Sequence, residues 1–486
     1  MLTLDFQLKS KWPKLAWVAV IGLESGRVKV LHGPMVEVRD DWMVEGVWDG
    51  CFADGDFDKT DLIFGTGIRK RSKDLIFVSS ATGSDRIWHV KQNDKSCISN
   101  SLPALLAISG LSLRDDYPLY TPDMESVDVK GLYSYTKKIP SNGPDINVVY
   151  FNNILWRDGV FQEIEKPELT PSLPDFKSYE EFLTDVSKKL GKNARASSRT
   201  IPVNMLVGLS SGYDSVATAV IARHGGCKKA ASITNSASLW RGSDSGKHIA
   251  DRLEMECQTY LHDQRGYRLE TSIWAGCGRA SGRNLTLFDY PEPLCLYFSG
   301  GYGDTVWDRH CQGLTEPNGD LEEFLCEFRL ITGVFITLVP WWGIRKANKI
   351  QKINLLDEMK PWTMGTNYDR PIARRLIEEA GIPRGEFAIN KKDTSSSSPM
   401  RWPTTASAQT DLQRYLSSLG FRPPNNPKAN FLLKFSYIMS FIYKNTAKRF
   451  GISMWWRPWR KLPGIHLLFV WATHDLRDQF YLENKQ

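Results

Sequence analysis

The sequence predicts an α/β protein of two domains, a β-rich domain over residues 1–170 and a domain with a parallel sheet over residues 171–486. Three observations lead to this prediction. Short β-rich stretches fill the first 165 residues, and a proline-containing segment at 166–176 can continue neither a helix nor a central strand. After that segment, predicted strands and helices alternate, which is typical of a parallel sheet covered on both faces.

The composition is that of a soluble globular protein. The 486 residues are 42% hydrophobic and 24% charged, which is too apolar for a disordered chain. At roughly 150 residues per domain, this length accommodates two or three domains. The net charge of +7 attracts anions such as nucleotides but is well below that of a nucleic-acid-binding domain. We therefore expect no nucleic-acid partner.

Cysteine usage and hydropathy favour a cytoplasmic protein. The eight cysteines include no C-x-x-C pair, so neither a zinc ribbon nor a disulfide scaffold is indicated. Charged residues throughout positions 1–20 leave no apolar stretch for a signal peptide, and uncharged runs such as 331–344 are shorter than the roughly 20 residues of a membrane span. The eight histidines show no paired metal spacing, and G-x-S-x-G is absent, which argues against transition-metal and serine-hydrolase sites.

In the first domain, β-branched and aromatic stretches bounded by Gly, Asp or Ser predict strands. These predicted strands are 17–23, 27–33, 61–67 and 74–80. A helix is predicted over 101–109, because Pro103 suits its first turn and Gly110 would close it.

In the second domain, apolar runs and amphipathic stretches alternate. The predicted order is helix 179–190, strand 201–209, helix 216–224, strand 230–234 and helix 245–260. The glycines at 225–226 would end the second of these helices, and Asp244 is the expected N-cap of the third.

The stretch VGLSSGYDS at 207–215 lies between a predicted strand and a predicted helix, with the loop residues Leu209, Ser210, Ser211 and Gly212. Small residues let backbone N–H groups point inward, and the helix N-terminus adds partial positive charge. Such a turn is an anion cradle suited to pyrophosphate. Asp214 could hold Mg²⁺, and Ser210 and Ser215 offer hydroxyl groups. The Gly-Lys-Ser/Thr of a Walker loop is absent.

This stretch resembles the S-G-G-x-D-S motif of the PP-loop ATP pyrophosphatases. The matching residues are Ser210, Gly212, Asp214 and Ser215, whereas Ser211 replaces the first glycine of the pair. That replacement is tolerated if Ser211 has a negative φ. The resemblance implies ATP and Mg²⁺ as cofactors, with Ile233 and Thr234 at the end of the next strand near the adenine. The alternative is a small-residue turn without a ligand.

A second segment, YFSGGYGDTVWD at 297–308, resembles the asparagine synthetase motif S-G-E-G-[SA]-D-E. Its matching residues are Ser299, Gly300 and Asp304. The resemblance implies that Asp304 helps to hold metal and pyrophosphate. Gly301 and Thr305 stand where the family has glutamates, so the family's base chemistry and substrate choice do not carry over. A glycine-rich turn is the alternative.

A third segment, 368–392, predicts a helix with Pro371 near its start and Gly381 just past its end, followed by Lys391 and Lys392. It resembles the late synthetase segment of the same family, where a lysine stabilises the charge that develops as the acyl-adenylate forms. The resemblance implies this catalytic role for Lys391 or Lys392. A surface lysine pair is the alternative.

The N-terminal half resembles a diverged glutaminase domain of the asparagine synthetases. The segments that carry this resemblance are 50–67, 85–90 and 96–110. The family nucleophile is a cysteine directly after the initiator methionine, and here that position is Leu2. A leucine has no nucleophilic atom, so glutamine hydrolysis by the family mechanism is excluded. We expect a structural or docking module.

Residues 15–400 together resemble the asparagine synthetase-like amide ligases, which include β-lactam synthetases, lasso-peptide cyclases and relatives encoded with surface-polysaccharide genes. The resemblance implies an Ntn-hydrolase-like first domain and an adenine-nucleotide α-hydrolase-like second domain. It implies activation of a carboxylate as an acyl-adenylate, with release of pyrophosphate, and transfer to ammonia or an amine. We expect a specialised carboxylate, such as a sugar acid or a peptide, and a nitrogen donor that a separate amidotransferase could supply.

Two other functions are kept as alternatives, an inactive scaffold protein and an RNA-modifying PP-loop enzyme. The basic, Trp-rich extension at 444–462 either contacts a membrane surface peripherally or packs against protein. The sequence leaves the oligomeric state, including a homodimer, open.

Overall fold

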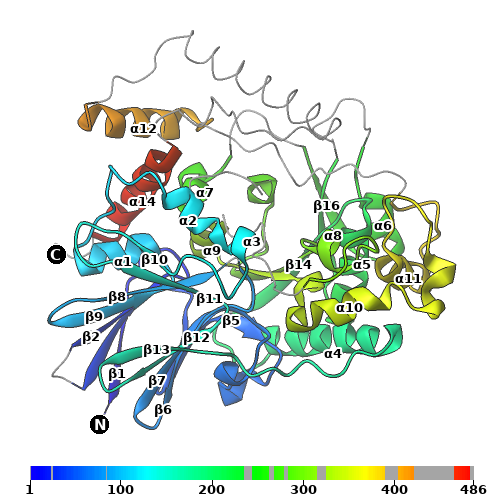
Figure 1. Ribbon diagram of the computed structural model, residues 1–486, viewed down its shortest axis with the longest axis horizontal. Coiled ribbons are helices and arrows are strands. Elements are labelled where there is room, and N and C mark those ends of the chain that lie inside the picture. Colours follow the sequence, from blue (N-terminus) through cyan, green and yellow to red (C-terminus); the bar gives the residue numbers. More distant parts are fainter. Residues whose placement is uncertain are drawn as a thin grey trace.

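The computed structural model describes residues 2–22, 26–83, 85–234, 243–261, 267–277, 283–314, 325–388, 403–420 and 465–481. Within these residues the protein is a mixed α/β structure with three sheets, one of which is all-parallel (Figure 1). The proline-containing segment 166–176 runs between the last strand of the first two sheets and the first helix that accompanies the parallel sheet.

The first two sheets are built from residues 3–164. The seven-stranded sheet has the order β1 (Thr3–Leu8), β3 (Arg27–His32), β2 (Trp17–Gly22), β9 (Lys95–Ser99), β8 (Arg86–Lys91), β11 (Ile146–Tyr150) and β10 (Lys138–Ile139). The six-stranded sheet has the order β13 (Val160–Ile164), β12 (Asn153–Arg157), β7 (Asp74–Val78), β6 (Ile63–Arg71), β5 (Trp42–Trp48) and β4 (Glu37–Arg39). The four strands predicted in this half are confirmed as β2, β3, β6 and β7.

These two sheets pack face to face. Side chains from both sheets enter one apolar cluster, which includes Val30 of the seven-stranded sheet and Met43 of the six-stranded sheet. Trp17 and Phe77 stack across the interface with ring centroids 6.3 Å apart. The outer face of the seven-stranded sheet is covered by α1 (Leu102–Ser109).

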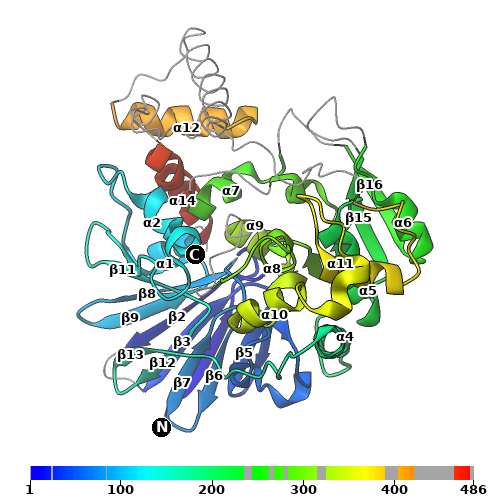
Figure 2. The ribbon, with the colours of Figure 1, turned by 45° about the vertical axis from the view of Figure 1, so that its right-hand side comes forward.

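The predicted helix at 101–109 is confirmed as α1. The Ser101 hydroxyl accepts a hydrogen bond from Ala104 N at its start, and Gly110 ends it in the left-handed conformation with φ 76°. The C-terminal helix α14 (Ile465–Tyr481) lies over α1 in both views (Figures 1 and 2). None of the described helices is long and apolar enough to cross a membrane.

The third sheet is parallel and has the order β16 (Glu256–Tyr260), β15 (Lys229–Ile233), β14 (Val203–Gly208), β17 (Leu294–Ser299) and β18 (Val334–Leu338). Buried apolar side chains cover both of its faces, as the strand–helix alternation predicts. The chain builds outward from β14 through β15 to β16 and then returns to β17 on the other side of β14. The strand order therefore reverses between β14 and β17, because later strands are added on the opposite side of β14.

The remaining described helices connect or cover these strands. They are α2 (Tyr120–Met124), α3 (Ser126–Lys130), α4 (Phe176–Ala194), α5 (Tyr213–His224), α6 (Lys247–Arg252), α7 (Glu270–Cys277), α8 (Gly303–Val306), α9 (Cys326–Thr332), α10 (Ala347–Ile353), α11 (Pro371–Glu379) and α12 (Ala406–Ser418). Short 3₁₀ helices are η1 (Phe52–Asp54), η2 (Phe57–Lys59), η3 (Arg283–Leu287), η5 (Val339–Trp341), η6 (Ile344–Lys346) and η7 (Asp357–Trp362).

The predicted helix at 245–260 is wrong over its second half. The helix α6 ends at Arg252, and residues 256–260 form the edge strand β16, which pairs with β15. The reason is local, because Glu254 adopts a positive φ of 56°, which a continuing helix cannot accommodate. Asp244 is not the N-cap either, since Gly246 holds that position.

A buried ion cluster joins the parallel-sheet region to both other sheets. Arg329 of α9 donates two hydrogen bonds to Glu45 of β5, at 2.7 and 2.9 Å, and a third to Asp85, which directly precedes β8. The three side chains are each at most 1% exposed. Charges this deep are tolerated only when they are paired and hydrogen-bonded.

A second carboxylate on α9, Glu327, lies at the same interface. It accepts hydrogen bonds from the Ser101 hydroxyl at 2.8 Å and from Leu102 N at 3.2 Å. These bonds bind α9 to the first turn of α1. Burial raises the pKa of Glu327 to about 7.

We expect Arg329→Met to lower the free energy of unfolding by about 3–5 kcal/mol, because Glu45 and Asp85 would remain buried without their cation. Urea unfolding at neutral pH measures this change. The matched control is Arg157→Met, which removes a solvent-screened pair with Asp74 and should leave the free energy of unfolding close to that of wild type. Equal losses in the two variants would contradict a structural role for the buried cluster.

The pKa of Glu327 predicts a pH-dependent stability. The folded-state pKa of Glu327, about 7, lies above the ordinary value of 4.5, so between these pH values the folded protein binds more protons than the unfolded protein. The contribution of Glu327 to the free energy of unfolding is therefore lost as pH rises through about 7. Glu327→Gln stays neutral and should gain up to about 3 kcal/mol relative to wild type between about pH 5 and about pH 8. Urea unfolding over this range measures the difference, and a constant difference contradicts the prediction.

Lys166→Met is a control for which the expected pH dependence of stability has the opposite sign. Burial lowers the pKa of Lys166 from 10.5 to about 7, so wild-type stability from this group rises with pH above about 7. The Lys166→Met variant should therefore lose stability relative to wild type as pH increases above about 7.

Candidate functional site

The candidate site lies where β14 and β17 end. The two strands are hydrogen-bonded neighbours in parallel register, with Val207 beside Phe298, so their carboxyl ends emerge together. Ligands of open parallel sheets bind outside the carboxyl ends of the strands, where the strand order reverses. The loop 209–212 follows β14, and the loop 300–302 follows β17.

The first loop is folded tightly over the start of α5. The hydroxyl oxygens of Ser210 and Ser215 lie 2.8 Å apart, and Ser210 N donates to the Ser215 hydroxyl at 3.1 Å. Gly212 N donates to the Ser210 hydroxyl at 3.1 Å. The loop therefore gathers two hydroxyl groups at the partially positive end of a helix, which favours an anionic ligand.

Ser211 does not disturb this loop. It does not adopt a positive φ, and its hydroxyl donates to Asp244 Oδ1 at 2.6 Å. Ser211 N donates to the backbone oxygen of Asp244 at 3.1 Å. The extra hydroxymethyl group is thus engaged with Asp244, which holds the loop instead of capping α6.

The two glycine-containing segments meet at Asp214. A Cβ on Gly300 would lie 2.7 Å from the backbone carbon of Asp214, and a Cβ on Gly303 would lie 2.4 Å from its Cγ. Only glycine permits this approach, because Cβ atoms do not come this close to other heavy atoms. Asp304, the next residue, is exposed in the first turn of α8. Ser299 is buried at the end of β17, where its hydroxyl accepts from Gly301 N at 3.1 Å.

Asp214 forms an ion pair that the sequence analysis missed. Nη1 of Arg370 donates to Asp214 Oδ2, and Arg370 Nε lies 3.7 Å from Asp308 Oδ2. Burial lowers the pKa of Arg370 to about 10. The other oxygen, Asp214 Oδ1, is buried and receives no hydrogen bond from any residue that the structure describes. Arg370 stands directly before Pro371, but nothing in the sequence distinguishes it from the other arginines of that segment.

Aromatic and cationic contacts fix α11 beside the loop. The Tyr213 ring lies 4.9 Å from Tyr368 and 5.8 Å from Phe387, measured between centroids. Arg374 of α11 donates to the Tyr213 hydroxyl. The predicted helix of this segment is confirmed, with Pro371 as its first residue and Gly381 at φ 85° after its end.

A cavity of about 420 Å³ opens beside the loop. It is lined by Ser211, Ser243, Ser245, His248, Gly385, Glu386, Phe387 and Ala388. Ala388 N donates to Ser211 O at 2.7 Å, which ties this wall to the loop. Lys391 and Lys392 follow shortly after Ala388 but lie outside the described residues, as does the extension 444–462.

Ile233 and Thr234, the two residues predicted to lie near the adenine, have different surroundings. The Ile233 side chain is buried in the apolar cluster on one face of the sheet. Thr234 is at the carboxyl end of β15, where its backbone oxygen accepts from the Ser243 hydroxyl at 2.6 Å. Since Ser243 lines the cavity, Thr234 is the nearer of the two to it.

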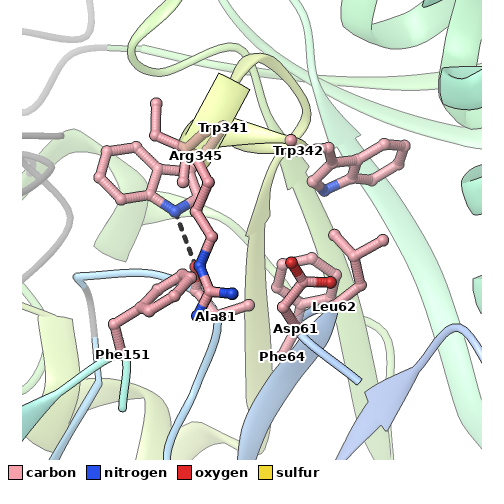
Figure 3. A pocket seen from close by; sticks show the side chains of 10 residues that line it. Asp61, Leu62, Phe64, Ala81, Phe151, Trp341, Trp342 and Arg345 are labelled. Atoms are coloured by element: carbon pink, nitrogen blue, oxygen red, sulfur yellow. Dashed lines mark hydrogen bonds between the residues drawn. The ribbon is translucent and has the colours of Figure 1, made fainter. Parts of the chain in front are cut away.

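A second hollow, of about 10 Å³, lies between the stacked sheets and the segment that follows β18. Figure 3 shows Trp341 and Arg345 on one side of it and Phe151 and Asp61 on the other. Trp341 Nε1 donates to Ala81 O at 2.7 Å, and the Arg345 guanidinium lies 5.1 Å from the Phe151 ring centre. This volume suffices for about one water molecule, so it is not a substrate site.

The residues at Asp214 fit a magnesium ion that arrives with phosphates. No cluster of three or more His, Cys, Asp or Glu residues forms a metal site within the part of the chain that the structure describes. Magnesium does not require one, since it commonly binds one or two carboxylates together with substrate phosphates. Asp214 Oδ1 is a buried oxygen that no described residue bonds, and Gly303, which packs against it, directly precedes Asp304.

We expect Gly300→Ala to lower the free energy of unfolding by about 1–3 kcal/mol, because the new methyl group would meet the Asp214 backbone, which cannot move aside. Thermal and urea unfolding measure the change. Gly385→Ala is the matched control, since no atom lies within 4 Å of a Cβ there and its φ is not positive. Indistinguishable unfolding of the two variants would show that the loops do not meet as described.

No model of a known protein family matches this chain. A search of curated proteins found no match either. The functional interpretation therefore rests on the loops, contacts and charges of the site itself.

Proposed function

We propose that the protein is an ATP- and Mg²⁺-dependent ligase that forms an amide through an acyl-adenylate. This proposal rests on one observation: the loops that follow β14 and β17 meet where the strand order of the parallel sheet reverses. One loop gathers the hydroxyls of Ser210 and Ser215 at the N-terminus of α5, and the other approaches Asp214 closely at Gly300 and Gly303. This arrangement suits a pyrophosphate-bearing ligand with a metal ion.

The architecture supports the same proposal. Stacked seven- and six-stranded sheets support an Ntn-hydrolase-like domain at 1–170, and the parallel sheet supports an adenine-nucleotide α-hydrolase-like domain at 171–486. The proposed nitrogen donor is ammonia or an amine, free or supplied by a separate amidotransferase, and the proposed carboxylate belongs to a specialised substrate such as a sugar acid or a peptide.

Each residue of the site has a proposed role. The loop 209–212 and the start of α5 bind the phosphates, and Asp214 and Asp304 hold Mg²⁺, which neutralises phosphate charge when bound. Thr234 lies at the edge that would face the adenine. The carboxylate attacks the α-phosphate of ATP, pyrophosphate leaves, and the amine then displaces AMP. The protein mainly positions the reactants and balances their charge.

The chain around Ala388 supports a catalytic role for Lys391 or Lys392. Ala388 N is bonded to Ser211 O, at the phosphate loop. Lys391 and Lys392 follow Ala388 in the sequence but lie outside the described residues. In the proposed reaction, one of these lysines stabilises the charge that develops during adenylation.

A scaffold protein without catalytic activity is the second candidate. The observations that favour it are the ion pair of Asp214 with Arg370 and the replacement of two family glutamates by Gly301 and Thr305. An RNA-modifying enzyme is disfavoured by the small net charge of +7.

Calorimetric titration with Mg²⁺ and the non-hydrolysable analogue α,β-methylene ATP tests the proposal. Wild type should bind the analogue, and Asp214→Ala should weaken binding at least about tenfold, or 1.4 kcal/mol, because the metal loses its carboxylate. Asp116→Ala, which alters an exposed aspartate outside the site, should bind like wild type. Absence of binding by wild type would favour the scaffold. Once binding is established, pyrophosphate release identifies the carboxylate substrate.

A further inference from the structure

We propose that Arg370 makes metal binding at Asp214 conditional on nucleotide phosphates, so that the free protein does not take up a divalent cation there. This inference rests on the proposed function. It assigns Arg370 a positioning role, because Arg370 acts through the Asp214 carboxylate and not on the reacting atoms.

The positive charge of Arg370 offsets the negative charge of Asp214 from the buried side of the carboxylate. Its side chain is 2% exposed, whereas the Asp214 side chain is 21% exposed, so the carboxylate stands between the guanidinium and the solvent. The guanidinium lies 5.1 Å from the centre of the Tyr368 ring, which together with Pro371 at the start of α11 holds it in place. The Arg370 cation therefore lies in the protein interior, on the side of Asp214 away from the solvent.

The two oxygens of Asp214 have different surroundings. Oδ2 accepts from Arg370, whereas Oδ1 is buried against Gly303 and receives no hydrogen bond from the residues that the structure describes. A buried carboxylate oxygen without a bond carries a desolvation cost, which a bound cation would reduce. Arg370 and Gly303 thus hold the carboxylate in one position in the free protein.

The charge balance explains why metal alone should not bind. The positive charge of Arg370 offsets that of Asp214, so a divalent cation approaching Oδ1 meets a carboxylate whose attraction is largely cancelled. Phosphate groups on the loop 209–212 would restore the negative charge. Magnesium favours such mixed sites of carboxylate and substrate phosphate, so metal and nucleotide should bind together.

Manganese titration followed by electron paramagnetic resonance tests this proposal, with Mn²⁺ as the probe. Wild type should bind no Mn²⁺ at Asp214 in the absence of nucleotide and should bind it when α,β-methylene ATP is added. Arg370→Gln should bind Mn²⁺ alone at least about tenfold more tightly than wild type, because a neutral side chain no longer offsets the charge of Asp214. Arg370→Lys keeps the charge and should behave like wild type.

Two further variants locate the metal. Combining Asp214→Asn with Arg370→Gln should abolish the new Mn²⁺ binding, because the carboxylate is lost. The proposal is overturned if wild type binds Mn²⁺ alone as tightly as Arg370→Gln, if Arg370→Lys behaves like Arg370→Gln, or if the double variant still binds.

The wild-type comparison needs no variant, so the proposal remains testable if Arg370→Gln does not fold, which circular dichroism and thermal melting would reveal. Tight Mn²⁺ binding by wild type without nucleotide would overturn the proposal by itself. Failure of wild type to bind α,β-methylene ATP would instead overturn the proposed function, so the two failures are distinguishable.

Discussion

The buried ion cluster of Arg329, Glu45 and Asp85 is the interaction on which the arrangement of the three sheets depends. It connects α9, which leads into the edge strand β18, to residues of both stacked sheets. Apolar burial alone is tolerant of small shifts, whereas paired charges without water have few alternative geometries. The cluster therefore defines one position of the parallel sheet relative to the other two, and Glu327 adds a neighbouring bond from the same helix to α1.

A fixed parallel sheet also fixes where the loops can meet. The register of β14 with β17 places the ends of the two strands side by side, and the glycines at 300 and 303 allow the second loop to touch Asp214. The α5 helix then begins against α11 through Tyr213 and Arg374. The geometry of the candidate site therefore depends on three features: the order of the strands, the glycines at 300 and 303, and the contact between α5 and α11.

The local parts of this structure could be predicted from sequence, and the long-range parts could not. β-Branched and aromatic stretches bounded by Gly, Asp or Ser identified β2 and β6, and Pro371 with Gly381 identified α11, because each signal lies within the element or at its ends. The break between α6 and β16 depends on the backbone of Glu254, which the residue type does not reveal. Arg329 and Arg370 were missed because their partners are far away in the sequence, so their burial leaves no local pattern.

The two buried arginines follow the same electrostatic principle with different outcomes. At Arg329 both partner carboxylates are shielded from solvent, so no ligand can replace the cation without exposing charge to an apolar interior. At Arg370 the partner carboxylate belongs to a side chain that is 21% exposed, so it reaches the surface of the site. The first pair can only hold the fold together, whereas the second leaves its acid open to a further cation. The difference lies in exposure of the acid, not in the arginine, and it separates a structural ion pair from one that can respond to a ligand.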